Sequence, residues 1–467
     1  MDKYDVVVLG GGPGGYVAAI RAAQTGLKTA IIEMDLLGGT CLNRGCIPTK
    51  TFVQNAEILH SIKKAKSRGI IVDKPMIDIA KMIESKNAVI KQLRNGIEVL
   101  LKSNNVKIFK GKGRVATGNI VNIENSEENI TISYDNLIIA TGSENFIPPI
   151  TGIDDGILTS TELLDVEKIP ESLAIIGGGV IGCEFASIFN ALGSKVTIIE
   201  MMPRLVANMD EDISLQLQKS LKKKKINIMV NSGVNAVEHI DDSYKMKITD
   251  KINNDVKEVV AEKILMSVGR RPNLEGLEVL NLEYDGRYIK IDEKMRTSCD
   301  NVYAIGDITG KVQLAHVASA QGRVAAEAIS GKNESKCNLD VVPGCIYTIP
   351  EIGSVGLTEA EAREKYGEDI LVGRFPVAAL GKAIAMGEPE GSFKVIAEAG
   401  SRKLLGMHIF GSNATDIIME AAVILQAEGT LDMITDTIHA HPTIAEGIME
   451  VAHEAEGHCI HMPSRKQ

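Results

Sequence analysis

The sequence contains no tryptophan, no apolar run long enough to cross a membrane, and few closely spaced cysteines. Charges or glycines interrupt its apolar segments within about 12 residues, whereas a membrane-spanning helix needs about 20. A strand-like segment begins near Tyr4, which leaves no room for a signal peptide before it. We therefore expect a cytoplasmic protein with no membrane partner.

The sequence also lacks an excess of positive charge. Its formal net charge is -10, and its one basic block, residues 222–225, is interpreted as the solvated end of a helix. Nucleic acids and anionic membrane surfaces attract basic proteins, so neither is an expected partner. A chain of 467 residues with 44% hydrophobic content has the length of about three typical globular domains, so we expect more than one hydrophobic core.

The seven cysteines do not form the pattern of a secreted disulfide framework. Only Cys41 and Cys46 are close together, in the segment GGTCLNRGCIPTK that ends at Lys50. Two buried cysteines or half of a zinc site are the alternatives to a redox pair, but no second Cys/His pair at metal spacing would complete four ligands. We expect a redox-active disulfide and no metal site.

Cys46 is predicted to lie at the start of a helix, because Ile47, Pro48 and Thr49 follow it and proline is favoured in a first helical turn. Backbone N–H groups and the helix dipole stabilise a thiolate at that end of a helix. One thiol of the pair should therefore be unusually acidic.

A nucleotide-binding pattern, G-x-G-x-x-G, occurs twice, each time between a strand-like and a helical segment. Its landmarks are Gly10, Gly12, Gly15 and Glu33 in the first copy, and Gly177, Gly179, Gly182 and Glu200 in the second. The first glycine allows a tight turn, the second lets the backbone approach a pyrophosphate, and the third brings helix and strand together. The closing glutamate accepts a hydrogen bond from a ribose hydroxyl. We predict two dinucleotide sites.

Two later segments add to this organisation. A short apolar strand ends on Asp307, whose carboxylate could bind a polyol hydroxyl or cap the following helix. From Val341 onward, strands and helices alternate without a further glycine pattern, which predicts a separate α+β domain.

Taken together, these motifs resemble the flavin-dependent disulfide oxidoreductases over nearly the whole chain. The resemblance is carried by residues 38–50, the two glycine patterns, residues 140–142, 268–273 and 304–307, and the segment HAHPT at 439–443 with Glu446. It implies an α/β fold with two Rossmann-like domains, for FAD and NAD, and a C-terminal α+β dimerisation domain. The implied limits are 1–147 and 270–338 for two segments of the FAD domain, 148–269 for the NAD domain, and 339–467 for the interface domain.

The resemblance also implies which residues surround each cofactor. Beyond the glycines of the first pattern, those implied for FAD are Glu33, Thr40, Lys50, Gly113, Thr141, Gly142, Ser143, Asp307, Gln313, Leu314, Ala315 and His316. Beyond the glycines of the second, those implied for NAD are Val180, Ile181, Glu184, Glu200, Val234 and Gly269. Gly113 and Val234 lie in the shortest motifs.

By the same resemblance, Cys41 exchanges with the substrate, Cys46 faces the flavin, and Lys50 supports negative charge beside it. His441, oriented by Glu446, is the expected base, because the unperturbed pKa of histidine lies near neutrality. In this family the histidine serves the partner subunit's flavin site, which implies a homodimer.

The substrate implied by the nearest branch of the family is protein-bound dihydrolipoamide. Its carrier would be the lipoyl domain of an acyltransferase or of a glycine-cleavage carrier protein. The enzyme would then serve a 2-oxo acid dehydrogenase, acetoin dehydrogenase or glycine cleavage complex.

Glu200 favours NAD over NADP because its carboxylate repels a 2′-phosphate, whereas Arg204 would attract one. Glutathione, trypanothione and mercuric reductases are the alternatives within the family, and a scaffold protein that keeps FAD without turnover is an alternative outside it. Arg44 replaces a small aliphatic residue between the cysteines, and it would either favour an acidic disulfide substrate or extend into solvent.

Overall fold

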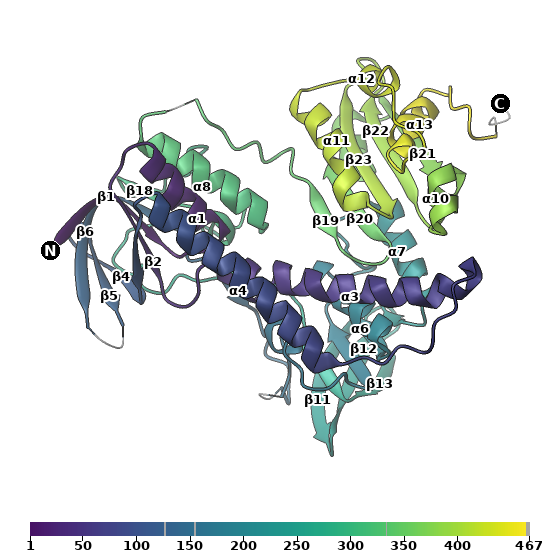
Figure 1. Ribbon diagram of the computed structural model, residues 1–467, viewed down its shortest axis with the longest axis horizontal. Coiled ribbons are helices and arrows are strands. Elements are labelled where there is room, and N and C mark those ends of the chain that lie inside the picture. The colour runs from purple at the N-terminus through teal and green to yellow at the C-terminus, as the bar shows by residue number, and fades with distance from the viewer. Residues whose placement is uncertain (126–127, 154–155, 333, 464–467) are drawn as a thin grey trace.

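The computed structural model describes residues 1–125, 128–153, 156–332 and 334–463. It contains three main β-sheets with helices packed against them, and two long helices run from the first sheet region toward the second (Figure 1). These long helices are α3 (Cys46–Ala65) and α4 (Ile79–Ser103). The N-terminus lies at the first sheet, and the described chain ends beside the third.

The first sheet has the strand order β3-β2-β1-β6-β5-β4, and β18 also pairs with β6. Strands β1, β2 and β3 are parallel, as expected where crossover helices connect them, and their central residues are buried. The strands are β1 (Asp2–Leu9), β2 (Thr29–Glu33), β3 (Lys107–Lys110), β4 (Lys112–Ala116), β5 (Ile120–Glu124), β6 (Ile130–Ile139) and β18 (Val302–Ala304). Because β18 comes after the whole second sheet, the chain returns to complete the first one.

Helices α1 (Pro13–Gln24) and α8 (Ala315–Ile329) lie side by side although they are far apart in sequence (Figure 1). Their backbones approach closely, because a Cβ atom added at Gly322 would lie 2.4 Å from the carbonyl oxygen of Gly14. The return segment therefore packs on the helix that follows the first glycine pattern. This contact places Asp307 beside the first dinucleotide site.

The second sheet has the parallel order β10-β9-β8-β14, and a separate antiparallel sheet β11-β12-β13 lies next to it. The strands of these two sheets are β8 (Ser172–Ile176), β9 (Lys195–Ile199), β10 (Asn227–Met229), β11 (Ser232–Ile240), β12 (Ser243–Asp250), β13 (Val256–Ala261) and β14 (Lys263–Met266). Its helices are α5 (Ser160–Leu163), α6 (Val180–Leu192) and α7 (Glu211–Lys223). Helix α6 is buried along most of its length, since it lies between this sheet and α3.

The third sheet is antiparallel, in the order β19-β20-β23-β22-β21, and forms the core of the C-terminal α+β region. Its strands are β19 (Gly344–Ile346), β20 (Glu351–Gly356), β21 (Ile370–Pro376), β22 (Ser392–Glu398) and β23 (Leu404–Gly411). The helices here are α9 (Glu359–Tyr366), α10 (Gly381–Met386), α11 (Ala414–Gln426), α12 (Leu431–Thr435) and α13 (Glu446–Ala455). The alternating strands that the sequence predicts after Val341 are present.

Short elements connect these regions. They are α2 (Gly39–Arg44), β7 (Ser143–Asn145), β15 (Arg270–Pro272), β16 (Tyr284–Asp285), β17 (Tyr288–Ile289), and the 3-10 turns η1 (Lys66–Arg68), η2 (Gly306–Thr309) and η3 (Val377–Ala379). The domain limits drawn from the sequence stay predictions.

A buried ion cluster joins the second and third sheet regions. The Nζ atom of Lys394, on β22, lies 2.7 Å from Oδ1 of Asp210 and 2.8 Å from carboxylate oxygens of both Asp212 and Glu359. The Lys394 side chain is 3% exposed, so its charge depends on these partners. The cluster fixes how the C-terminal region sits against α7.

Candidate functional site

Both glycine patterns form the same tight turn between a strand and a helix. Gly10 follows β1 with φ +102°, and Gly177 follows β8 with φ +108°, a backbone conformation that L side chains rarely adopt. A Cβ atom at Gly15 would lie 1.9 Å from the Gly10 carbonyl oxygen, and one at Gly182 would lie 2.0 Å from that of Gly177. In each turn the following helix packs directly against the backbone of the first glycine. Only a residue without a side chain fits at Gly15 or Gly182.

The middle glycine of each pattern faces open space instead. A Cβ atom at Gly179 would meet nothing within 4 Å, and one at Gly12 only the Cα atom of Gly39 at 4.0 Å. A ligand can therefore approach the backbone at both positions. This cradle fits the pyrophosphate of a dinucleotide, which binds to backbone N–H groups at a helix N-terminus.

The two acidic residues are held in matching ways. Glu33 accepts hydrogen bonds from the N–H groups of Gly11 at 2.6 Å and Asp35 at 2.8 Å. Glu200 accepts from the N–H groups of Gly178 and Met202. Each carboxylate is thus fixed at the end of the second strand of its unit, where a ribose hydroxyl can donate to it.

One cavity of 1730 Å³ extends past both cradles. Sites for a single small molecule measure about 300–1,000 Å³, so this cavity has room for more than one such ligand. Of the predicted site residues, all but Gly182, His441 and Glu446 line it, including Gly113 and Val234. Gly182 lies behind the turn, as its packing role requires.

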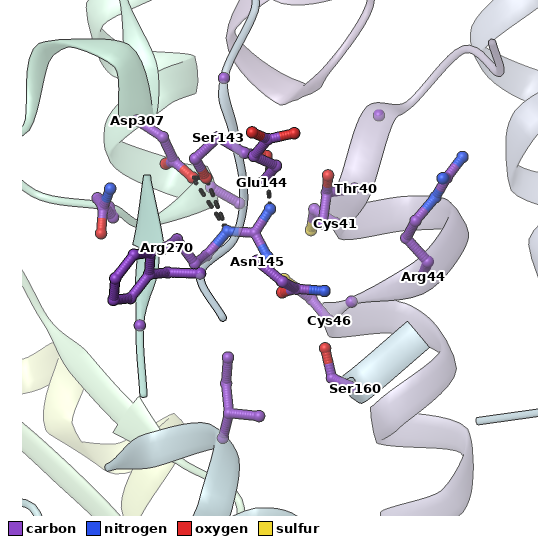
Figure 2. Close-up of a pocket in the computed structure, with 18 of the residues that line it drawn as sticks. Thr40, Cys41, Arg44, Cys46, Ser143, Glu144, Asn145, Ser160, Arg270 and Asp307 are labelled. Atoms are coloured by element: carbon purple, nitrogen blue, oxygen red, sulfur yellow. Dashed lines mark hydrogen bonds and ion pairs between the residues drawn. The ribbon is translucent and has the colours of Figure 1, made fainter. Parts of the chain in front are cut away.

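The two cysteines lie at the junction of α2 and α3 and line this cavity (Figure 2). Cys46 is the first residue of α3, as the sequence predicts. A hydrogen bond from the Cys41 thiol, aided by the charge of Lys50, outweighs burial and lowers the pKa of Cys46 to about 7. The same hydrogen bond and burial raise the pKa of Cys41 far above its usual range. Cys46 is therefore the thiol that carries negative charge.

Lys50 lies one turn after Cys46 and is held from two sides. Its Nζ atom lies 2.9 Å from Oε2 of Glu184, on α6, and 4.2 Å from the ring centroid of Tyr347. Oε1 of Glu184 also accepts a hydrogen bond from the backbone N–H of Tyr347 at 3.0 Å. The sequence predicts Glu184 as an NAD contact, and the structure adds its ion pair with Lys50.

Arg270 is a cavity residue whose role sequence reasoning missed, although it lies in the quoted motif at 268–273. Its guanidinium donates to the hydroxyl and carbonyl oxygens of Ser143 and to Oδ1 of Asn145, at 2.6–2.8 Å (Figure 2). The Ser143 hydroxyl in turn donates to Oδ2 of Asp307. An arginine directly after a glycine turn was the sequence signal for this role. Only the fold shows that Arg270, on β15, binds residues of β7.

His441 and Glu446 form the predicted pair. Nδ1 of His441 lies 2.8 Å from Oε1 of Glu446, whose Oε2 accepts from the N–H of Thr443. Burial by itself would raise the pKa of Glu446, but these two contacts hold it below its usual range. The His441 side chain is 76% exposed and does not line the cavity within its own chain. His439 lies nearby, with Nε2 3.0 Å from Oε1 of Glu420.

Arg204, which could have attracted a 2′-phosphate, is turned toward its own backbone. Its guanidinium donates to the carbonyl oxygens of Ala207 at 2.9 Å and Met209 at 3.4 Å. Both contacts use the Nη2 atom of the guanidinium. Glu200 is therefore the charged group fixed at the end of β9. The geometry thus favours a ribose with a free 2′-hydroxyl.

The described residues contain no cluster of three or more His, Cys, Asp or Glu side chains arranged to hold a metal ion. Nor is any helix in the described part of the chain long and apolar enough to cross a membrane.

Two dinucleotide cradles and a pair of cysteines on one cavity define an oxidoreductase with two dinucleotide cofactors and a redox-active dithiol. Residues 4–322 match the family described as pyridine nucleotide-disulphide oxidoreductase, and residues 342–452 match its dimerisation domain. The chain belongs to this family. The predicted fold class is thereby confirmed, as are FAD and NAD as cofactors.

Curated relatives match over the full length. The chain is 42% identical to the dihydrolipoyl dehydrogenase of Chlamydia muridarum, with 100% of each chain covered. It is 39% identical to that of Bacillus subtilis, with 98% of this chain and 99% of the relative covered. Among solved structures, the flavoprotein disulfide reductase RclA of Escherichia coli, in its Cu(II) complex, superposes with a TM-score of 0.87 at 29% identity, covering 97% and 99% of the two chains.

Our first prediction concerns the charge of Cys46. With FAD bound, the long-wavelength absorbance of the half-reduced enzyme reports a thiolate beside the flavin. Because the pKa of Cys46 is lowered to about 7, this absorbance should be present above pH 7 and fade as the pH falls through it. Lys50→Met should move the midpoint to higher pH, because it removes a nearby positive charge.

Lys64→Met is the matched control, since Lys64 lies on the same helix but pairs with Glu388. Cys46→Ser should abolish the absorbance, whereas Cys41→Ser should show it without reduction. A midpoint that Lys50→Met leaves in place would contradict the assigned cause.

A second prediction concerns nucleotide choice. Glu200→Ala should lower kcat/KM for NAD by a factor of roughly 10 to 150, which corresponds to the loss of about 1.5–3 kcal/mol for a hydrogen bond to a charged acceptor. Glu200→Gln keeps the shape but removes the repulsion of a 2′-phosphate, so its larger effect should be a gain with NADP. Glu33→Gln is the control, because it alters the equivalent residue of the other site. An unchanged NAD/NADP ratio in Glu200→Gln would refute this role.

Proposed function

We propose that the chain is a dihydrolipoyl dehydrogenase, which oxidises protein-bound dihydrolipoamide to lipoamide and reduces NAD⁺ to NADH. The observation that carries the proposal is the unequal cysteine pair, in which Cys46 is the acidic thiol and Cys41 the non-acidic one, in a cavity shared by two dinucleotide cradles. Full-length relatives that are named for this activity support it.

The disulfide between the cysteines is the oxidant for the substrate. A substrate thiolate attacks Sγ of Cys41, which forms a mixed disulfide and breaks the bond to Cys46. Cys46 leaves as a thiolate, the form that the positive charge of Lys50 stabilises. The second substrate thiol then attacks the sulfur bound to Cys41, which closes the lipoamide ring and releases the Cys41 thiol.

The substrate thiol must lose a proton before each attack. His441 suits this role because Glu446 engages its Nδ1 atom, so Nε2 is the nitrogen left to exchange a proton. Glu446 stays ionised at neutral pH, since its pKa lies below the usual range, and it can stabilise the imidazolium that forms.

FAD and NAD, when bound, supply the route by which the electron pair of the reduced cysteines leaves as NADH. The chain positions that chemistry through Glu33 and Glu200 at the two riboses. Lys50 and Cys46 lie side by side on one face of α3, where they meet the cavity.

We further propose that the enzyme is a homodimer in which His441 serves the partner subunit. The match to the family's dimerisation domain and the high exposure of His441 support this arrangement. Its carrier substrate would be the lipoyl domain of an acyltransferase or of a glycine-cleavage carrier protein. The cytoplasm is the proposed compartment, because the cysteines outside the redox pair are scattered singly along the sequence, unlike those of a secreted disulfide framework.

The decisive assay compares turnover with dihydrolipoamide and with glutathione disulfide, each with the NAD and the NADP pair. We expect turnover with dihydrolipoamide and NAD⁺, and its loss in Cys41→Ser and Cys46→Ser. Turnover confined to glutathione disulfide with NADPH would contradict the proposal, as would full activity of Cys41→Ser.

A mixed-dimer experiment tests the shared site. Homodimers of Cys46→Ser and of His441→Gln should each be nearly inactive. Refolded together at equal concentration, random association gives about half mixed dimers, each with one intact site, so roughly a quarter of all sites should recover. If mixed dimers form and no activity returns, His441 acts within its own chain.

A further inference from the structure

Arg44 stands between the redox cysteines, where the resemblance leads us to expect a small aliphatic residue, and neither the dithiol chemistry nor the dinucleotide cradles account for it. It is the last residue of α2, and its guanidinium forms an ion pair with the carboxylate of Asp35. Figure 2 shows the side chain directed away from the gap between Cys41 and Arg270. Arg44 therefore points away from the sulfur atoms that meet the substrate.

Asp35 connects this ion pair to the first dinucleotide site. Its backbone N–H donates to Oε1 of Glu33 at 2.8 Å, and the other oxygen of Glu33 is held by Gly11 at 2.6 Å. Arg44, Asp35 and Glu33 all line the cavity. A chain of contacts thus leads from the helix of Cys41 to the carboxylate that receives the adenosine ribose.

A second set of contacts fixes the same loop. The Nδ2 atom of Asn43 donates to the carbonyl oxygens of Leu37 at 3.0 Å and Gly39 at 2.9 Å. The N–H of Gly38 donates to the carbonyl oxygen of Gly11 at 2.8 Å. The loop between β2 and α2 is therefore held by these contacts at its α2 end, and Arg44 holds it through Asp35 near its β2 end.

Charge adds to this geometry. The carboxylates of Glu33 and Asp35 face a site that takes a diphosphate, so negative groups gather there. Burial raises the pKa of Glu33, and the positive charge of Arg44 counteracts it. The other cation of the cavity near this edge, Lys112, is paired with Glu275. Arg44 is thus the cation placed to keep Glu33 ionised as a hydrogen-bond acceptor.

We propose that Arg44 is a positioning residue for the first dinucleotide site, which retains FAD by fixing Asp35 and thereby the ribose-binding carboxylate of Glu33. Arg44 does not select the disulfide substrate. The proposal concerns the FAD site alone and does not depend on which dithiol the enzyme oxidises.

The test measures the release of FAD from the holoenzyme by the rise of flavin fluorescence after dilution. Arg44→Val should release FAD about three- to tenfold faster, because it removes an ion pair and loosens a charge-assisted hydrogen bond. Arg44→Lys should fall between it and the parent. Lys3→Val is the control, since it breaks an exposed ion pair, with Asp135, whose residues do not line the cavity.

The KM for dihydrolipoamide and the circular dichroism spectrum should be unchanged in Arg44→Val, which separates this role from substrate recognition and from misfolding. An increased KM with unchanged FAD release would overturn the proposal in favour of substrate recognition. If neither the KM nor the rate of FAD release changed, Arg44 would only extend into solvent, and the proposal would also be overturned.

A double variant tests whether Arg44 acts through Asp35. In the Asp35→Asn background, Arg44→Val should change FAD release less than it does in the parent enzyme, because their shared contact is already lost. Fully additive effects would mean that Arg44 acts on the cofactor independently of Asp35, which would refute the positioning role.

Discussion

The arrangement of this site depends on one buried carboxylate, that of Glu184. Its side chain projects from α6 of the second sheet region. It accepts hydrogen bonds from Nζ of Lys50, which follows the first glycine pattern, and from the backbone N–H of Tyr347 in the C-terminal region. A buried charge is costly unless it is paired, so these partners must stay in place together. The three regions are thereby fixed around α3, whose first residue is Cys46.

The same contacts divide the work between the two sulfurs. Lys50 supplies positive charge next to Cys46, and the Cys41 thiol donates to it, so negative charge collects on one sulfur. Cys41 gains a proton once it is released from the mixed disulfide, and its raised pKa favours the neutral thiol in the reduced pair. Such an asymmetry favours one direction of the proposed exchange, because the sulfur whose thiol has the lower pKa leaves faster when the other is attacked.

Much of this could be predicted from the sequence, because the informative patterns are local. The two glycine patterns, the cysteine pair and the segment around His441 each combine residue types that few other structures require. They predicted the family, the α/β fold with its C-terminal domain, and both cofactors, all of which are confirmed. The domain limits and the roles of single residues such as Val234 stay predictions, since short motifs define them weakly.

The sequence by itself thus determined which chemistry the chain carries, because glycines, cysteines and acids are needed at fixed spacings along a strand, turn and helix. Only the tertiary structure decided which partners the long side chains contact. Arg270 turns toward Ser143 and Asp307, Arg204 toward backbone carbonyls, and Arg44 toward Asp35. A guanidinium can reach several partners from one backbone position, so its direction depends on which oxygens the packing of distant segments brings within reach.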